Sequence, residues 1–406
     1  MNIAFVTYEY PPETGGGGIG TYVVNAARML HRRGHHVEIF AGGDHTRSLK
    51  TPEGVPLHRV QCSAWPDFKD AVLPVFSNRY RAVDFDVVEG PEYNADALRI
   101  QEQFPDLPVV VKLHTSSFML YDINIGRHLT TWDKARFILG GLRRGYIPTD
   151  LPWEYTPDGD VERRHTRNAD VVAAPSASIR DITARAWGLD PDAVLHFPYP
   201  FEATAPFLNV PVDTDTDTVT FIGRLEMRKG VLDLADAIPH VLDRHPDARF
   251  QLVGRSLEHP RTDEDIRTLM ERRLAAYDDR VDFLGLVPYE TIPDLLTQSD
   301  VCVFPSLWEN FPNVCLEAMT AARGVVGSAR GGMAEMLDDG RVGNVVEPGN
   351  APALADAILD LLNHPDRRKE YGAAARQRVL DAYSFDAVGP QQEACYEAAL
   401  DAQPAA

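Results

Sequence analysis

The sequence predicts an α/β protein built from two doubly wound, Rossmann-like parallel-sheet domains that face each other across a cleft. The chain has 406 residues, which is more than a single core of ordinary size usually serves. Short apolar runs alternate with stretches of helical periodicity along both halves of the chain, the pattern of parallel sheets with helices on both faces. A loose stretch over 201–218 separates the halves, so we expect domains at 1–205 and 206–385.

The first half shows a β-α-β unit at its start, because an apolar run at 3–7 precedes a helical pattern that ends at Gly34 and a second apolar run at 36–41. Further strands are expected at 86–89, 108–114, 171–175 and 194–197, and helices at 95–103 and 178–187. In the second half, strands are expected at 219–222, 249–253, 281–284, 301–304 and 324–327. The helices expected there are 231–242, 264–277, 291–298, 314–322, 351–362, 366–382 and 388–399. Ligands of such sheets bind at the carboxyl ends of the strands, so the site is expected between the domains.

Composition and charge narrow the function. With 40 basic and 60 acidic side chains the formal net charge is −20, which argues against nucleic-acid partners. The four cysteines, Cys62, Cys302, Cys315 and Cys395, include no C-x-x-C pair, so we expect reduced structural thiols and no metal centre. There is no long apolar run and no signal-peptide pattern, and a cytoplasmic protein is therefore expected.

A glycine-rich loop follows the first expected strand. Gly15, Gly17 and Gly20 formally fit G-x-G-x-x-G, and Glu38 stands where a ribose-binding acid of a dinucleotide site could lie. Seven residues, Tyr8–Thr14, separate the strand from the first glycine, however, and the fingerprint needs its turn almost directly after the strand. We therefore favour a loop whose backbone N–H groups, at Gly17 and Gly18, meet a phosphate or a sugar. A plain surface loop is the alternative.

Two further segments carry charged residues at expected strand-to-helix loops. Arg224 and Lys229 stand close to the start of a helix, where cations are unfavourable unless an anion such as a diphosphate balances them. Glu309 and Glu317 flank another helix start, eight residues apart, and carboxylates of this kind accept hydrogen bonds from a ribose diol or a sugar hydroxyl. We expect Pro312 to be the first helical residue, with free backbone N–H groups directed at the cleft.

Together these segments resemble the retaining glycosyltransferases of the GT-B fold, family 4, and the resemblance covers nearly the whole chain. It rests on the glycine loop, on Gly223-Arg224…Lys229-Gly230, on Glu309-x7-Glu317 with its Pro-Ser lead, and on Gly331-Gly332-Met-Ala-Glu335. The resemblance implies a helix at 386–401 that packs back on the first domain. It also implies these donor-binding residues: Arg224, Lys229, Glu309, Asn310, Phe311, Pro312, Asn313, Val314 and Glu317.

The resemblance further implies a role for His114 beside the transferred sugar, and with Glu309, Arg224 and Lys229 it is our candidate for catalysis. A lone histidine at the end of an apolar strand is otherwise as often a structural residue. Glu89, Glu92, Tyr93 and Asn94 follow another strand and are candidates for acceptor binding, although an ordinary loop with helix-capping acids would look the same.

The expected reaction is transfer of a sugar from a nucleotide diphosphate sugar to a hydroxyl acceptor, with retention and without a cofactor or metal. The loop at 286–290 offers only Glu290 as a carboxylate for a guanine edge, so we favour uridine diphosphate, with Arg255 at the same end of the pocket. The acceptor is open between a glycan, a lipid-linked sugar and a small metabolite. Alternatives are an epimerase, hydrolase or phosphorylase of this fold, a NAD(P)-dependent oxidoreductase using Gly15–Gly20, and a non-catalytic sugar-nucleotide binding module.

Two other segments stand out. Asp213-Thr-Asp215-Thr-Asp217 resembles a metal motif of another glycosyltransferase fold, but it lies in the expected linker, and we interpret it as solvated charge. Residues 127–146 combine apolar side chains with five basic ones, Arg127, Lys134, Arg136, Arg143 and Arg144. This pattern fits a weak contact with the inner face of a membrane, although we favour a flap on the acceptor side because the protein is acidic.

Overall fold

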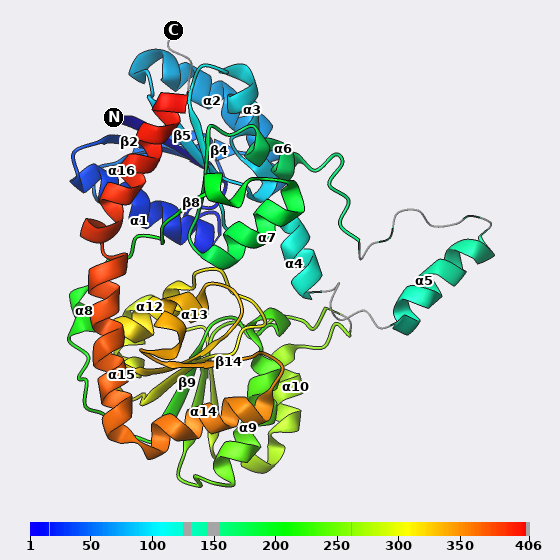
Figure 1. The fold of residues 1–406 in the computed structure, drawn as a ribbon, viewed down its shortest axis with the longest axis vertical. Helices are drawn as coiled ribbons and strands as arrows, with labels where there is room; N and C mark the ends of the chain where they lie inside the picture. The colour runs from blue at the N-terminus through cyan, green and yellow to red at the C-terminus, as the bar shows by residue number, and fades with distance from the viewer. Residues whose placement is uncertain are drawn as a thin grey trace.

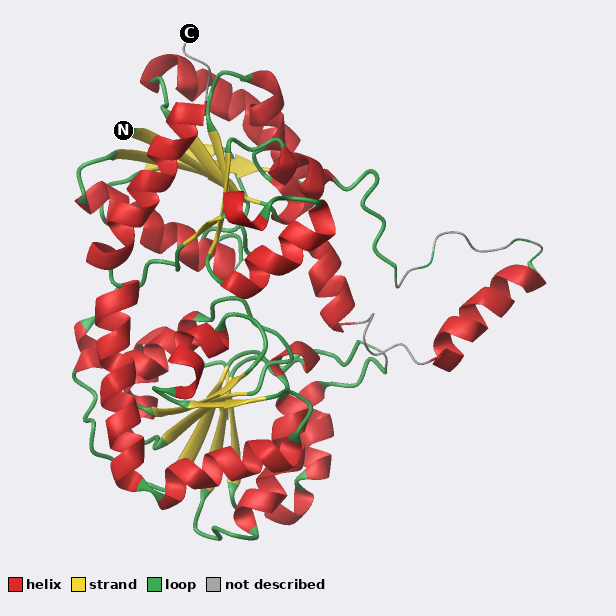
Figure 2. Ribbon diagram, viewed as in Figure 1, coloured by secondary structure: helices red, strands yellow, loops and turns green. Residues whose placement is uncertain are grey.

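A computed structural model describes residues 1–15, 17–124, 131–144, 146, 151, 154–260 and 262–402. The chain forms two α/β units, each with its own sheet covered by helices on both faces (Figure 1, Figure 2). The first sheet lies within 1–205 and the second within 206–385. The sequence prediction of two parallel-sheet domains is confirmed.

The first sheet has the strand order β3-β4-β2-β1-β5-β6-β7-β8, and every neighbouring pair is parallel except β3 and β4. Its strands are β1 (Asn2–Thr7), β2 (His36–Gly43), β3 (Arg47–Lys50), β4 (Pro56–Gln61), β5 (Val87–Pro91), β6 (Val109–Lys112), β7 (Val171–Ala174) and β8 (Leu195–His196). The helices of this unit are α1 (Gly18–Arg32), α2 (Phe68–Val83), α3 (Leu98–Gln103), α4 (Ser117–Asn124), α5 (Thr131–Arg143), α6 (Val161–Arg167) and α7 (Ala177–Trp187).

The second sheet has the order β11-β10-β9-β12-β13-β14 and is parallel throughout. Its strands are β9 (Thr218–Ile222), β10 (Arg249–Val253), β11 (Val281–Gly285), β12 (Val301–Phe304), β13 (Gly324–Ser328) and β14 (Asn344–Val346). The remaining helices are α8 (Ala205–Leu208), α9 (Val231–Leu242), α10 (Ile266–Arg273), α11 (Ile292–Thr297), α12 (Asn313–Thr320), α13 (Met333–Met336), α14 (Ala351–Asn363), α15 (Pro365–Arg378) and α16 (Phe385–Ala402).

The carboxyl ends of the central strands place the functional loops. Parallel strands end at one edge of a sheet, so the loops after β1, β5 and β6 lie together, as do those after β9 and β12. The strands themselves are apolar and almost fully buried, which fixes them as sheet interior and leaves the polar residues to the loops. The two sets of loops face each other between the units.

The last helix, α16, returns to the first unit. Its buried Gln392 and Tyr396 both donate to Glu89 Oε2 on β5, at 2.9 and 2.8 Å, and Tyr22 of α1 donates to Glu89 Oε1 at 2.6 Å. Glu393 adds an exposed pair of bonds to Arg33. Figure 1 shows α16 running along one side of the molecule from the second unit to the first. A burial of this kind makes the helix part of the first unit's core.

The segment expected to be a loose linker is partly ordered. It contains α8, and Asp300 Oδ2 accepts hydrogen bonds from Thr216 N and Asp217 N, both at 2.8 Å. Carboxylate oxygens of Asp215, Asp217 and Asp300 lie within 4.8 Å of one another. These residues precede β9 and β12, so they lie at the amino ends of the strands, at the edge of the sheet opposite the cleft. A role as metal ligands for a donor diphosphate is therefore excluded.

Candidate active site

A hollow of about 240 Å³ lies between the two units, and both contribute side chains to it. The first unit provides Glu9, Gly17, Gly18, Ile19, Trp65, Tyr93, His114, Thr115, Leu120 and Tyr199. The second unit provides Arg224, Arg228, Glu309, Asn310 and Phe311. Of the site residues predicted from the sequence, the structure brings these together around the hollow: Gly17, Gly18, Tyr93, His114, Arg224, Glu309, Asn310 and Phe311. Gly16, within the glycine loop, lies outside the described residues.

Glu309 is the centre of the second unit's wall. Its two carboxylate oxygens each lie 3.1 Å from Arg228 Nη1, and Oε2 also bonds Lys229 Nζ. Burial acts to raise the pKa of Glu309, but the charges of Arg228 and Lys229 outweigh it and hold the pKa at about 2. The carboxylate is therefore ionised at any physiological pH. Burial lowers the pKa of Lys229, with Glu309 opposing that shift.

Two glycines allow these charged loops to come together. Gly230 has φ of +67°, and a Cβ built on it would lie 1.9 Å from the carbonyl oxygen of Pro305. Gly331 has φ of +87°, and its Cβ would lie 1.8 Å from the carbonyl oxygen of Glu309. Neither position tolerates a side chain, because both the conformation and the space demand glycine. The glycines of the Lys-Gly and Gly-Gly segments therefore set the approach of Lys229 to Glu309.

The sequence argument for a diphosphate at Arg224 and Lys229 is corrected in one respect. Lys229 ends a short 3₁₀ turn (Met227–Lys229) and does not lie inside the first turn of α9. Its balancing anion is Glu309, while Arg224, with a side chain 54% exposed, lies 3.1 Å from Glu226. The two acids thus balance the cations of this wall, and a bound diphosphate would have to compete with them for Arg224 and Lys229.

Glu317 lies on α12 and does not line the hollow. It is 7% exposed, and burial raises its pKa to about 8, with a hydrogen bond from Tyr289 acting against that shift. Pro312 was expected to be the first helical residue of α12, but α12 begins at Asn313 and Pro312 is its N-cap residue. No side chain at the N-cap position hydrogen-bonds the backbone N–H groups of the first turn. Arg255 is exposed and outside the hollow; its carbonyl accepts from Leu225 N.

His114 follows β6 and is fixed by Tyr199. Tyr199 Oη lies 2.8 Å from the carbonyl oxygen of Leu113 and 2.6 Å from His114 Nδ1. A carbonyl oxygen only accepts, so the single hydroxyl proton is directed to Leu113, and we assign the imidazole proton to Nδ1. Burial lowers the pKa of His114 to about 3, so the ring is neutral. Its Nε2 then carries a lone pair and can accept a hydrogen bond from a hydroxyl.

Asn310 crosses between the two units. Its Nδ2 donates to the carbonyl oxygen of His114, and its Oδ1 accepts from Ser176 Oγ at 2.9 Å. Glu335, in the Gly-Gly-Met-Ala-Glu segment, adds an acceptor for Ala177 N at 3.0 Å and for His196 Nε2 at 2.8 Å. Polar contacts therefore join the two units beside the hollow, and those made by Asn310 are buried.

Two of the acceptor candidates, Glu89 and Glu92, are buried and are bound by other groups of the protein. Glu89 binds α16, as described above, and is 2% exposed. Glu92 is fully buried and accepts from His114 N through both oxygens, at 2.9 and 2.7 Å. Asn94 is turned into a left-handed conformation, where its N–H donates to Glu162. These groups build the loop that holds His114, and of the four candidates only Tyr93 reaches the cleft.

Seven lining residues escaped the sequence analysis, namely Glu9, Ile19, Trp65, Thr115, Leu120, Tyr199 and Arg228. Arg228 stands one position before Lys229, and the 3₁₀ turn that directs both to Glu309 leaves no periodic signal. Glu9 was counted only as spacer, yet a Cβ on Gly17 would lie 2.5 Å from its Oε1, so the glycine loop folds against this carboxylate. The position of Glu9, two residues after the end of β1, was the available signal.

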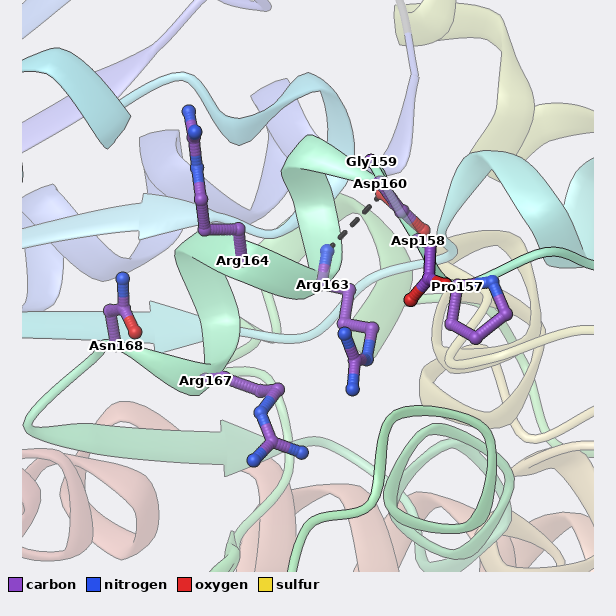
Figure 3. Close-up of a pocket in the computed structure, with 8 residues that line it drawn as sticks. All are labelled: Pro157, Asp158, Gly159, Asp160, Arg163, Arg164, Arg167 and Asn168. Carbon is purple, nitrogen blue, oxygen red and sulfur yellow. Dashed lines mark hydrogen bonds between the residues drawn. The ribbon is translucent and has the colours of Figure 1, made fainter.

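A second hollow, of about 300 Å³, lies away from the cleft along α6 and the loop before it (Figure 3). Figure 3 shows Arg163 and Arg167 extending to one side of α6 and Arg164 to the other. Arg167 Nη1 donates to the carbonyl oxygen of Trp187 at 2.7 Å, and Arg164 lies 3.2 Å from Glu102. Asp158 and Asp160 share the rim. Because acids accompany these arginines, the hollow is weakly charged and we assign it no ligand.

The segment predicted to touch a membrane or cover the acceptor is only partly described. Arg127 lies outside the described residues, and α5 stands apart from both sheets in Figure 1. Its exposed apolar side chains include Trp132, at 70%, and Leu139. No helix among the described residues is long and apolar enough to cross a membrane. Both the membrane contact and the flap stay predictions.

Two parallel α/β sheets facing each other across a shared hollow are the architecture of the GT-B glycosyltransferases. Sucrose-phosphate synthase from Thermosynechococcus elongatus superposes with a TM-score of 0.71 at 21% identity, covering 98% of each chain. HepE of Anabaena, solved in complex with UDP, has a TM-score of 0.69 at 19% identity, covering 98% of this chain and 100% of that one. These similarities establish the fold class.

Sequence comparison gives the family. Residues 17–200 match the glycosyl transferase 4-like domain, and residues 216–364 match the glycosyl transferases group 1 family. The chain belongs to glycosyltransferase family 4, group 1, and is an enzyme of glycosyl transfer. It is 28% identical to α-maltose-1-phosphate synthase of Mycolicibacterium smegmatis, over 96% of this chain and 97% of that protein. It is 25% identical to glycogen synthase of Mycobacterium tuberculosis, over 98% and 95%.

Proposed function

We propose that this enzyme transfers a sugar from a nucleotide diphosphate sugar, with UDP as the favoured nucleotide, to a hydroxyl of an acceptor, and that the anomeric configuration is retained. The observation that carries the proposal is the pairing of a cationic wall, Arg224, Arg228 and Lys229, with a neutral His114 across one hollow. The cations suit a diphosphate leaving group, and the imidazole suits the hydroxyls of the sugar between them.

Retention is supported by the absence of a well-placed base on the second unit's wall, among the residues that the structure describes there. Glu309 has a pKa of about 2 and is held by two cations, so it is a poor proton acceptor and a poor nucleophile. His114, with a pKa of about 3, is a poor base too. The proposed step breaks the bond from the anomeric carbon to the phosphate oxygen and forms the bond to the acceptor oxygen on the same face. The acceptor proton passes to the departing phosphate.

For the nucleotide, the support comes from relatives and from one loop. HepE was solved with UDP and with UDP-glucose, whereas a starch synthase IV from Arabidopsis thaliana was solved with ADP and acarbose. Both nucleotides are therefore compatible with this fold. The loop at 286–290 offers a single carboxylate, Glu290, for the edge of a guanine base, so it does not favour guanine. Tyr289 of the same loop hydrogen-bonds Glu317. The free thiols support a cytoplasmic location.

The test begins with thermal-shift measurements of the enzyme with UDP, ADP, GDP and TDP. Turnover is then measured with two donors that carry the nucleotide diphosphate that binds best, one with glucose and one with mannose. A nucleotide that binds the folded state raises its melting temperature, by more the further its concentration exceeds its Kd, and at equal concentration UDP is expected to raise it most. Proton NMR of the early product then gives the anomeric configuration. An inverted product would overturn retention, and rapid release of free sugar or an epimer without any acceptor would favour a hydrolase or an epimerase.

A further inference from the structure

The first unit's wall of the hollow contains a set of aromatic rings that the proposed donor chemistry does not use. Trp65 and Tyr93 line the hollow, and Tyr8 lies behind Trp65. The rings of Tyr8 and Trp65 are stacked with centroids 4.9 Å apart, and Trp65 meets Tyr93 edge to face at 4.8 Å. Trp65 and Tyr93 are only partly buried, so part of this aromatic wall is open to the hollow.

The wall is held rigidly. Trp65 Nε1 donates to Asp96 Oδ1 at 3.1 Å, and the other oxygen of Asp96 accepts from Tyr8 N at 2.7 Å. Asp96 is 1% exposed, so a buried carboxyl fixes both the indole ring and the end of β1. An aromatic ring whose polar group is already hydrogen-bonded to the protein can present its apolar face to a ligand. Because such a ring is already fixed, it loses little side-chain entropy when the ligand binds.

Glu9 is the polar partner of this wall. Its Oε2 accepts from Gly20 N at 3.3 Å, and the carboxylate lines the same hollow. Burial raises the pKa of Tyr93, and the charges of Glu162 and Glu9 act in the same direction. Among the described residues, the first unit's part of the lining includes no lysine or arginine.

We infer that the acceptor is an uncharged saccharide, one ring of which packs on Trp65 and Tyr93 while a hydroxyl donates to Glu9. The inference rests on the proposed transfer reaction and adds the acceptor class to it. The C–H groups of a pyranose face are weakly positive and are attracted to the negative face of an aromatic ring. A carboxylate accepts hydrogen bonds from hydroxyls, but it repels a phosphate at the same place. Phosphorylated sugars and phosphoinositides are therefore poor acceptors for this wall.

The experiment measures saturation-transfer difference NMR on UDP-saturated enzyme with glucose, maltose, glucose 1-phosphate, glucose 6-phosphate and glycerol as probes. Glucose or maltose is expected to bind, with transfer to ring C–H protons, and the two phosphates are expected to bind more weakly by roughly tenfold or more. Stronger binding of either phosphate than of both neutral sugars overturns the inference. Binding of glycerol equal to that of the sugars overturns the aromatic contribution.

Variants give a second measurement. Trp65→Ala is expected to weaken neutral sugar binding by roughly tenfold, and Trp65→Phe by less, because it keeps a ring. Glu9→Gln is expected to reduce the discrimination against glucose 1-phosphate, since the amide no longer repels it. The matched control is Glu53→Gln, which removes a carboxylate paired with Arg28 outside the hollow and leaves sugar binding unchanged. Unaltered discrimination in Glu9→Gln contradicts the inference.

The donor side separates this inference from the proposed function. Binding of UDP and slow hydrolysis of the nucleotide sugar, both measured without any acceptor, are expected in the wild-type enzyme and in the control Glu53→Gln. If wild-type enzyme neither binds a nucleotide nor turns over a nucleotide sugar, the proposed function fails. If it does both while the phosphorylated sugars bind best, only the acceptor assignment fails.

Discussion

The two walls of the hollow differ in kind. The second unit's wall consists of charges that satisfy one another, with Arg228 and Lys229 on Glu309 and Arg224 beside Glu226. The first unit's wall is aromatic and, apart from Glu9, uncharged, with His114 kept neutral by burial. The difference indicates a division of work in which one wall handles the charge of the leaving group and the other recognises the neutral surfaces of sugars. Substitutions on the charged wall should therefore cost most.

The largest effect is expected for Lys229→Ala. Removing this cation takes away stabilisation of the charge that develops on the leaving group, and kcat/KM should fall by roughly 10²-fold or more. Arg228 still binds both oxygens of Glu309, so the fold is expected to persist, which circular dichroism and a melting curve would check. Arg224→Ala, at an exposed side chain, should cost less. A variant at position 229 with the wild-type rate would remove Lys229 from the reaction.

A smaller loss is expected for Tyr199→Phe. The substitution keeps the ring against Tyr22 and Phe311 but removes the acceptor for the proton on His114 Nδ1. Loss of one such hydrogen bond is worth about 1 kcal/mol, so kcat/KM should fall by roughly fivefold to tenfold. Nitrogen-15 NMR of His114 would show a Nδ1–H tautomer in the wild type and a mixed population in the variant. Tyr396→Phe, which also loses a buried hydroxyl bond but at a residue that does not line the hollow, is the control and should retain the tautomer.

A different kind of effect, on stability rather than on activity, is expected from the titration of Glu317. Burial raises its pKa from 4.5 to about 8, so the folded protein resists ionisation that the unfolded chain undergoes near pH 4.5. The contribution of Glu317 to stability is complete below pH 4.5 and is lost as the pH rises to about 8. Glu317→Gln lacks this titration. Without ligand, its free energy of unfolding relative to that of the wild type should therefore rise between pH 5 and pH 8, by at most about 1.4 kcal/mol per pH unit, and its relative melting temperature should rise with it. A constant difference over that range would show that Glu317 is not buried as described. The exposed Glu290→Gln serves as control.

The smallest effect is expected on chelation of divalent metals. Three cationic side chains already face the hollow or its Glu309, and they supply the charge that a metal ion would otherwise provide. The cluster of Asp215, Asp217 and Asp300 lies at the other edge of the second sheet. Activity in excess EDTA should equal that in magnesium. Loss of activity in EDTA, restored by magnesium or manganese, would contradict the expectation.

The overall fold was predictable because it depends on local alternation of apolar strands and amphipathic helices. Within the stretch from 44 to 83, β3 was missed because it is exposed along its whole length, and α2 because Pro74 within it hides a regular pattern. The buried strand β4 was missed as well. β14 was missed because its three residues are only half-buried. Elements at the edge of a sheet bury less surface, so they leave a weaker signal in the sequence.

The site was predictable where its residues follow one strand, and not where they converge from several. Glu309 and Arg224 follow β12 and β9 directly, and a local pattern identified both. Glu89 was expected to follow a strand but lies within β5, and Gln392 and Tyr396, which are distant in the sequence, bind its carboxylate. The set of Glu9, Trp65 and Tyr93 depends on three separate loops, so no single stretch of sequence reveals it.

The attachment of α16 to Glu89 has a consequence for biosynthesis. Until α16 has left the ribosome, the carboxylate of Glu89 on β5 lacks two of its three side-chain hydrogen-bond donors, and the surface around it stays uncovered. The amino-terminal half therefore matures last, although it is translated first. Truncating the polypeptide before Phe385, and so removing this helix of 18 residues, would damage the half that is most distant in sequence.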